Sequence, residues 1–176
     1  TFISNTAVQG GGVYVGGARL TIAASRFLTN TADDVGGAIR AQGGALDVKD
    51  SEFDYNSSSG PQGGGAIYSQ IVLVVRGSTF YSNTAQYWNV GNGPGGAIRS
   101  LGSTSGLIEI LIANSTFSQN HANWLGGGIF TVYSAVYITN STLVSNSANT
   151  ADGGGNVYLY PLAGALTLKN TILAGG

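Results

Sequence analysis

The chain has 176 residues, enough for one domain with a substantial core, and 43% of them are hydrophobic, which argues against intrinsic disorder. Seven Lys and Arg against eight Asp and Glu give a net charge of −1, so the basic surface of a nucleic-acid-binding protein is missing. The absence of cysteine excludes a disulfide framework and thiol chemistry, and no apolar run approaches the ~18 residues of a membrane-spanning helix. Methionine is also absent, even at position 1, and we interpret the chain as a segment processed from a longer protein.

The sequence is a repeat of about 26 residues, seen most clearly in FLTNTADDVGGAI at 27–39. Each repeat has a Phe, an Asn three residues later, a short polar loop, then Gly-Gly and an aliphatic residue. The Phe position recurs at Phe2, Phe27, Phe53, Phe80, Phe117, Leu143 and Leu173. A unit of this length buries its apolar face only by stacking on its neighbours. The chain is therefore expected to form a solenoid.

Three short strands are expected in each repeat. One follows Gly-Gly, a second has the pattern of LTI at 20–22, and the third ends at the Phe position. Apolar and polar residues alternate over these short spans, and no segment shows helical periodicity. The sequence thus predicts an all-β fold: a single-stranded right-handed parallel β-helix of six to seven coils with three short strands per coil. We expect one domain over residues 1–176, either a segment of a longer repeat array or a stackable subunit.

Stacking the repeats aligns apolar residues in four columns that contain no charged residue. The first column after Gly-Gly is Val13, Ile39, Ile67, Ile98, Ile129 and Val157. The next two are Leu20, Leu46, Leu73, Ile110, Val136 and Leu166, and Ile22, Val48, Val75, Ile112, Ile138 and Leu168. The fourth is the Phe column. These columns are predicted to fill the interior of the solenoid.

Polar columns are predicted to mark the bends. An Asn column, expected to form a hydrogen-bonded ladder, is Asn5, Asn30, Asn56, Asn83, Asn120 and Asn146. A second column favours residues that tolerate a left-handed backbone: Ala24, Asp50, Gly77, Asn114, Asn140 and Asn170. A hydroxyl column follows directly, at Ser25, Ser51, Ser78, Ser115, Ser141 and Thr171.

Two signatures of the chain resemble those of a known family. The sequence GGAI occurs at 36–39, 64–67 and 95–98, and Phe-x-x-Asn occurs at 27–30, 53–56, 80–83 and 117–120. Both are similar to the repeats of chlamydial polymorphic outer-membrane proteins, within the pectin-lyase-like superfamily of β-helices. The resemblance implies a surface or secreted passenger-type domain used for adhesion or structure, located outside the cell or at its surface.

No catalytic, metal-binding or cofactor-binding group is predicted. No two of the eight acids fall in the same column of adjacent coils, so a carboxylate pair of the glycosidase type is not formed. Asp33 and Asp34 lack the further oxygen ligands that Ca²⁺ needs, and the lone His121 is expected to be an exposed loop residue.

One set of residues is a candidate ligand-binding site. The outward column beside the first apolar column is Tyr14, Arg40, Tyr68, Arg99, Phe130 and Tyr158, and nearby bends supply Tyr87, Trp88 and Trp124. Alternating aromatic and arginine side chains on neighbouring strands can stack through cation–π contacts. Such a ladder either stabilises the sheet or forms a flat platform for a sugar chain or a protein partner.

The leading functional hypothesis is a non-enzymatic extracellular structural or adhesive β-helix, with self-assembly end to end into filaments as an extension. The alternative is a carbohydrate-binding or polysaccharide-active β-helix. A third is ice binding through the threonine row Thr79, Thr116 and Thr142. The expected partners are further copies of the chain, or glycans and proteins of a surface, and not nucleic acid. Asn56, Asn114 and Asn140 begin Asn-x-Ser/Thr tripeptides, which are N-glycosylation acceptors in a eukaryotic secretory pathway.

Overall fold

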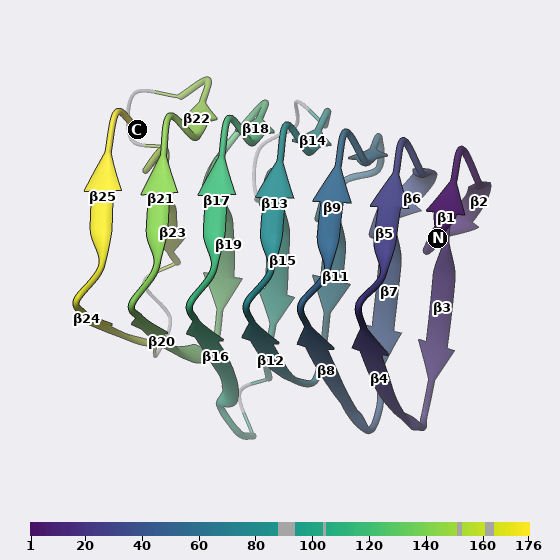
Figure 1. The fold of residues 1–176 in the computed structure, drawn as a ribbon, viewed down its shortest axis with the longest axis horizontal. Helices are drawn as coiled ribbons and strands as arrows, with labels where there is room; N and C mark the ends of the chain where they lie inside the picture. Colours follow the sequence, from purple (N-terminus) through teal and green to yellow (C-terminus); the bar gives the residue numbers. More distant parts are fainter. Residues whose placement is uncertain (88–93, 104, 151–152, 161–163) are drawn as a thin grey trace.

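The structure is a computed structural model that describes residues 1–87, 94–103, 105–150, 153–160 and 164–176. Its strands form four parallel sheets that run along a solenoid (Figure 1). In the view of Figure 1 the chain rises through the front sheet, descends through the back sheet and advances from right to left. This is the right-handed parallel β-helix that the sequence predicts.

Each sheet takes one strand from every coil. Sheet A consists of β1 (Phe2–Ile3), β5 (Arg26–Leu28), β9 (Glu52–Asp54), β13 (Thr79–Tyr81), β17 (Thr116–Ser118), β21 (Thr142–Val144) and β25 (Ile172–Ala174). Sheet B consists of β2 (Thr6–Gln9), β6 (Thr31–Val35), β10 (Ser57–Ser58), β14 (Thr84–Ala85), β18 (His121–Ala122) and β22 (Ser147–Ala148). Sheet C consists of β3 (Val13–Gly16), β7 (Ile39–Gln42), β11 (Ile67–Ser69), β15 (Ile98–Leu101), β19 (Ile129–Val132) and β23 (Val157–Leu159). Sheet D consists of β4 (Arg19–Ala23), β8 (Ala45–Lys49), β12 (Val72–Arg76), β16 (Ile108–Ala113), β20 (Ser134–Thr139) and β24 (Ala165–Lys169).

The strand register confirms the four apolar columns. Phe2, Phe27 and Phe53 are direct partners in sheet A, and their rings stack with centroids 4.5 and 4.8 Å apart. The Ile column of sheet C and both aliphatic columns of sheet D pair residue for residue as expected. Their members in the middle coils are fully buried and form one continuous core. Burial of such side chains, at about 1.5–3 kcal/mol each, is the main stabilisation of the solenoid.

Sheet B is a fourth sheet that the sequence analysis did not predict. Its strands follow the Asn column directly, where a polar loop was expected, and several have only two residues. Ala32, Ala85 and Ala122 are fully buried, whereas the residues before them, Thr31, Thr84 and His121, are partly exposed on the outer side. Two residues are too few to display an alternating pattern, so this strand is recognised only from the pairing of coils.

The bends have the backbone geometry that their residues predict. The column from Ala24 to Asn170 has φ between 44° and 57° at each of its six positions. A second left-handed column precedes the ladder asparagines: Ser4, Thr29, Tyr55, Ser82, Gln119 and Ser145. Its composition gives no signal of this conformation. At the bend between sheets B and C, a Cβ on Gly37 would lie 2.1 Å from the carbonyl oxygen of Gly65, so close stacking of coils requires glycine there.

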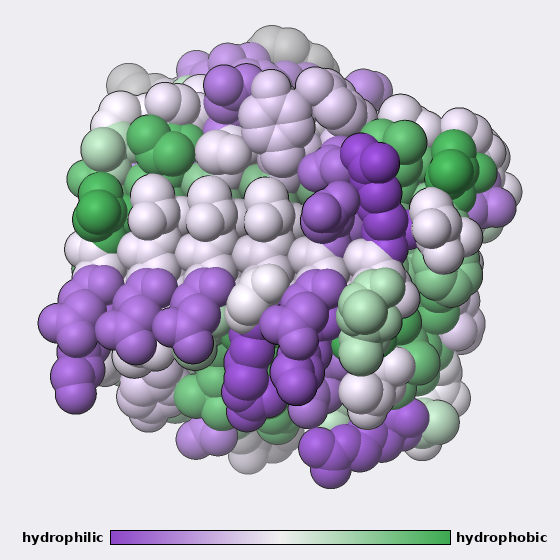
Figure 2. Space-filling view, viewed as in Figure 1, coloured by the Kyte–Doolittle hydropathy of each residue, from purple (hydrophilic) through white to green (hydrophobic). Residues whose placement is uncertain are grey.

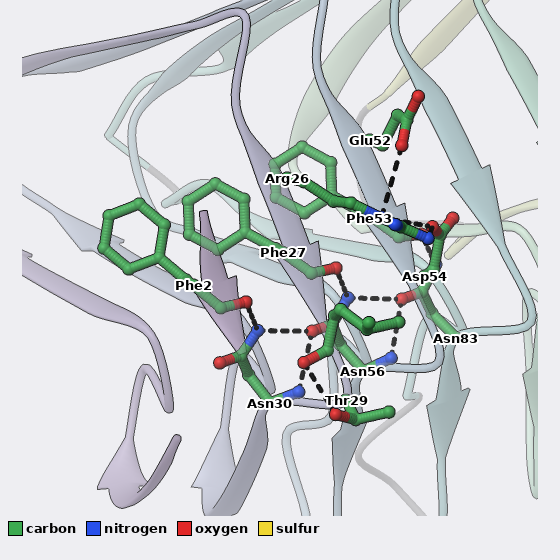
Figure 3. Close-up of polar contacts among 11 residues, drawn as sticks. Phe2, Arg26, Phe27, Thr29, Asn30, Glu52, Phe53, Asp54, Asn56 and Asn83 are labelled. Carbon is green, nitrogen blue, oxygen red and sulfur yellow. Dashed lines mark hydrogen bonds and ion pairs between the residues drawn. The ribbon is translucent and has the colours of Figure 1, made fainter. Parts of the chain in front are cut away.

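The asparagine column forms the predicted ladder (Figure 3). The side-chain oxygen of Asn83 accepts hydrogen bonds from the backbone and side-chain nitrogens of Asn56, at 3.0 and 2.9 Å. The side-chain nitrogen of Asn83 donates to the Phe53 carbonyl and to the next asparagine, Asn120. Each internal asparagine thus satisfies backbone groups at a buried bend, where an unpaired group would be costly. The serine column forms a second ladder, in which Ser78 donates its backbone N–H to the hydroxyl of Ser115.

Candidate functional site

The outward column of sheet C forms the stacked ladder predicted from the sequence. The Arg40 guanidinium lies 5.3 Å from the ring centroid of Tyr14 and 5.8 Å from that of Tyr68. Arg99 lies 5.7 Å from the Tyr68 ring and 5.4 Å from the Phe130 ring. The ladder is continuous across six coils because the parallel register places each residue directly beside its equivalent.

The middle of this ladder is covered. Tyr68, Arg99 and Phe130 are only 1%, 3% and 1% exposed, whereas Tyr14 at the N-terminal end is 52% exposed. The segment before β11 lies over Tyr68 and Arg99, since Gln62 accepts hydrogen bonds from Arg99 through its backbone carbonyl and from the Tyr68 hydroxyl through its side chain. The alternation of apolar and polar residues in the sequence correctly predicts that the Arg99 side chain lies outside the solenoid. Its burial could not be predicted, because the loop that covers it does not follow the repeat.

Burial changes the ionisation of the covered residues. Desolvation raises the pKa of Tyr68 above its ordinary value, and the nearby Arg99 and Arg40 partly oppose this rise. Desolvation lowers the pKa of Arg99 to about 10, opposed by Tyr68. Arg99 is therefore a buried cation whose described neighbours are aromatic rings and a carbonyl oxygen. It acts as a packing element within the ladder.

The N-terminal end of the ladder is closed by amide side chains. Arg40 donates to the side-chain oxygens of Gln9 and Gln42, and Gln9 donates to Asp34 at 2.9 Å. Asp34 is thus held by an amide. Tyr14 is the ladder residue with the largest exposed fraction, and Arg40 lies over one face of its ring.

The C-terminal end of the ladder is an aromatic cluster outside the main core. Phe130 stacks on Tyr158, with centroids 5.7 Å apart and rings 5° from parallel, and Tyr160 lies at 6.4 Å. Trp124 and Tyr133 pack against the same cluster and are partly exposed. Tyr133 and Tyr160 were missed in the sequence because they lie outside the repeating columns. Of the two other expected residues, Tyr87 is half-buried, and Trp88 lies outside the described residues.

Several acidic residues pair with basic ones. Arg26 forms ion pairs with Glu52 and Asp54, at 3.3 and 3.1 Å, and Arg76 pairs with Asp47 at 3.1 Å. All of these pairs are at the surface, where they contribute little to stability. Within the described ranges, no three His, Asp or Glu side chains come together as a metal site would require.

His121 lies in strand β18 and is half-buried, so the expectation of an exposed loop residue was wrong. One ring nitrogen, Nδ1, is 2.9 Å from the Ser147 hydroxyl, and the other, Nε2, is 3.1 Å from the side-chain oxygen of Asn123. Because that oxygen can only accept, Nε2 is the protonated nitrogen and Ser147 donates to Nδ1. The pair occupies the outward hydroxyl column of sheet B, in register with Thr84, and we interpret it as a link between coils.

The outer face of sheet A, seen in Figure 2, contains the threonine row. Thr79, Thr116 and Thr142 are direct partners in adjacent strands. The row ends at Glu52 on one side and at Ile172 on the other. It is therefore three residues long, a short array for the ice-binding hypothesis.

No helix long and apolar enough to cross a membrane occurs in the part of the chain that the structure describes. Comparison with protein families matches residues 50–70 and 114–132 to the Chlamydia polymorphic membrane protein repeat. No curated protein and no solved structure matches the sequence. Both matched segments start at the left-handed bend, at Asp50 and Asn114, and run through sheets A and B to the strand of sheet C. The chain is thus a parallel β-helix in which the same portion of two coils is similar to the repeat of the Chlamydia polymorphic membrane proteins.

Proposed function

We propose that the chain is a non-enzymatic structural or adhesive β-helix displayed outside the cell or at its surface. The observation that supports this most directly is how the repeated polar residues are used. The asparagine and serine columns and the arginines of the ladder bond to equivalent residues of neighbouring coils. Groups used in this way stiffen the solenoid and are not available to a substrate.

The match to a repeat of membrane proteins supports a location at a surface. A stiff solenoid holds its outer faces at a fixed spacing, which suits adhesion and structural roles alike. The test is binding of the purified, fluorescently labelled chain to cells and to immobilised matrix proteins. We expect saturable binding, and a chain that binds no surface and does not self-associate would contradict the proposal.

Self-assembly end to end is a further part of this proposal. Strands β24 and β25 expose three residues of the core columns, Leu166 (37%), Leu168 (42%) and Leu173 (43%), and the outward-facing Ile172 (60%) beside them. A second copy stacked in register would place its β2, β3 and β4 on β22, β23 and β24. Its β1 would then fall on the position that β25 occupies, because sheet A has one strand more than the other sheets.

This geometry gives a sharp test by electron microscopy. Deletion of residues 171–176 removes β25 and lets all four sheets of two copies meet in register. We expect the shortened chain to form longer filaments than the full chain at equal concentration. Single short particles for both chains would contradict self-assembly.

A second function, carbohydrate binding, is favoured by the partly exposed aromatic cluster around Phe130. Aromatic faces stack on the apolar faces of sugar rings, and Trp124 and Tyr158 lie at its edge. The test is a glycan array followed by calorimetry. Trp124→Ala should abolish the binding of any glycan that is found, and Tyr14→Ala, at the other end of the ladder, should leave it unchanged. Equal affinity of Trp124→Ala and the unchanged chain would exclude this site.

A further inference from the structure

Three tripeptides of the chain have the Asn-x-Ser/Thr pattern, and the fold treats them differently. Asn56 belongs to the internal ladder and is fully buried. Its side-chain nitrogen donates to the Phe27 carbonyl at 3.0 Å and to Asn83 at 2.9 Å. An enzyme cannot reach this nitrogen without unfolding the coil.

Asn114 and Asn140 lie at the bend between sheets D and A and are exposed, with φ of 51° and 48°. In the described part of the chain, neither side-chain nitrogen donates a hydrogen bond, and the Asn140 oxygen accepts one from Asn170 at 3.2 Å. Figure 2 shows hydrophilic side chains in a row along this bend, at the C-terminal coils.

The hydroxyl residues of both tripeptides are also accessible. Thr116 and Thr142 begin strands β17 and β21, and their side chains are partly exposed on the outer face of sheet A. The serine between Asn and Thr is buried in the serine ladder, as seen for Ser115, and fixes the conformation of the bend. The amide nitrogen and the hydroxyl of each tripeptide are thus presented together on a rigid corner.

We propose that Asn114 and Asn140 are N-glycosylation sites of the folded chain and that Asn56 is not. The donor is a sugar activated at its anomeric carbon by phosphate, either a nucleotide sugar or a lipid-linked pyrophosphate. The bond from the anomeric carbon to the phosphate oxygen breaks, and a bond to the asparagine Nδ2 forms. The amide proton passes to a base of the transferase, and the nucleoside diphosphate or lipid pyrophosphate leaves.

Asn170 is a built-in control. It occupies the same bend one coil later, is exposed and has φ of 47°, but the second residue after it is Ile172. Ile172→Thr completes the pattern at this position. The Asn170 of that variant is expected to become a third acceptor, whereas Asn170 of the unchanged chain is not.

The experiment incubates the folded chain with a soluble transferase that recognises Asn-x-Ser/Thr, using a nucleotide-activated glucose, and maps the modified residues by mass spectrometry. A parallel arm incubates the folded chain with a detergent-solubilised oligosaccharyltransferase and lipid-linked oligosaccharide, which distinguishes the two donors. We expect sugar on Asn114 and Asn140 and none on Asn56 in the folded chain. Thr116→Ala and Thr142→Ala should each remove one sugar, and circular dichroism should show that both variants remain folded.

Two results would overturn the proposal. The first is modification of Asn56 to the same extent as Asn114 in the folded chain, because burial would then not protect it. The second is a folded chain without sugar at Asn114 and Asn140 in both arms, while a control acceptor peptide is modified.

Discussion

The asparagine ladder makes a quantitative prediction at its centre. Asn83→Ala removes four hydrogen bonds: two donated by its side-chain nitrogen to Phe53 and Asn120, and two accepted by its oxygen from Asn56. Asn56 Nδ2 keeps its bond to the Phe27 carbonyl, and Asn120 Oδ1 keeps one from the backbone of residue 83. The Asn56 backbone N–H and the Phe53 carbonyl lose these partners.

Both groups belong to fully buried residues, so water cannot replace the lost partners. An unsatisfied buried polar group costs about 1–3 kcal/mol, and we therefore expect Asn83→Ala to lower the free energy of unfolding by about 2–6 kcal/mol. The assay is equilibrium unfolding in urea, followed by circular dichroism.

The matched control is the exposed first member of the same ladder. Asn5→Ala removes one side-chain bond, to Asn30 at 2.8 Å, and its backbone N–H keeps the same acceptor. We expect its cost to stay near or below about 1 kcal/mol. If Asn5→Ala and Asn83→Ala destabilise equally, the buried ladder does not satisfy the bends in the way described.

Three further predictions concern the core and the sheet C ladder. Ile98→Asp should prevent folding or reduce stability by several kcal/mol, because it buries an unpaired charge, whereas Tyr14→Asp should be tolerated, as urea unfolding will show. The raised pKa of Tyr68 means that the folded chain favours the neutral form of its hydroxyl. The contribution of this residue to the free energy of unfolding is complete below the pKa of about 10 that tyrosine has in the unfolded chain. That contribution is lost as the pH rises through the higher pKa of the folded chain. Tyr68→Phe should therefore weaken the loss of stability above pH 10, measured by thermal unfolding across pH, and an unchanged pH profile would contradict burial of the hydroxyl. Arg99→Lys should cost about 1–2 kcal/mol, because an ammonium cannot stack between two rings as a guanidinium does, and a chain of unchanged stability would argue against the sandwich.

Most of the fold could be predicted because the period of the sequence is also the period of the structure. When residues about 26 apart become direct neighbours, each column reports one environment several times over, and chance variation at a single position matters little. The left-handed bend shows this well. Ala24 alone gives no signal, but Asp50, Gly77 and Asn114 in the same column identify the conformation that Ala24 also adopts.

What the sequence did not reveal lies in segments without such repetition. Sheet B was missed because strands such as Ser57–Ser58 are too short for an alternating pattern. Burial of Tyr68 and Arg99 was missed because it depends on a single loop near Gln62, which has no equivalent of the same length in every coil. The ladder itself was correctly predicted, but its exposure was not, and exposure decides whether aromatic residues can meet a ligand.

This division between repeated and unrepeated residues bears on where a partner could bind. A residue that recurs in every coil interacts with its equivalents in the two adjacent coils, as Asn83 does with Asn56 and Asn120. Changing it alters the fold before it alters recognition. Specificity must therefore come from positions where one coil differs from the next, such as Trp124 in its bend or Arg26 opposite Glu52. If substitution of such a residue weakens binding and leaves the free energy of unfolding unchanged, the partner binds on the outer surface. If only substitutions of ladder residues weaken binding, the cause is destabilisation of the fold.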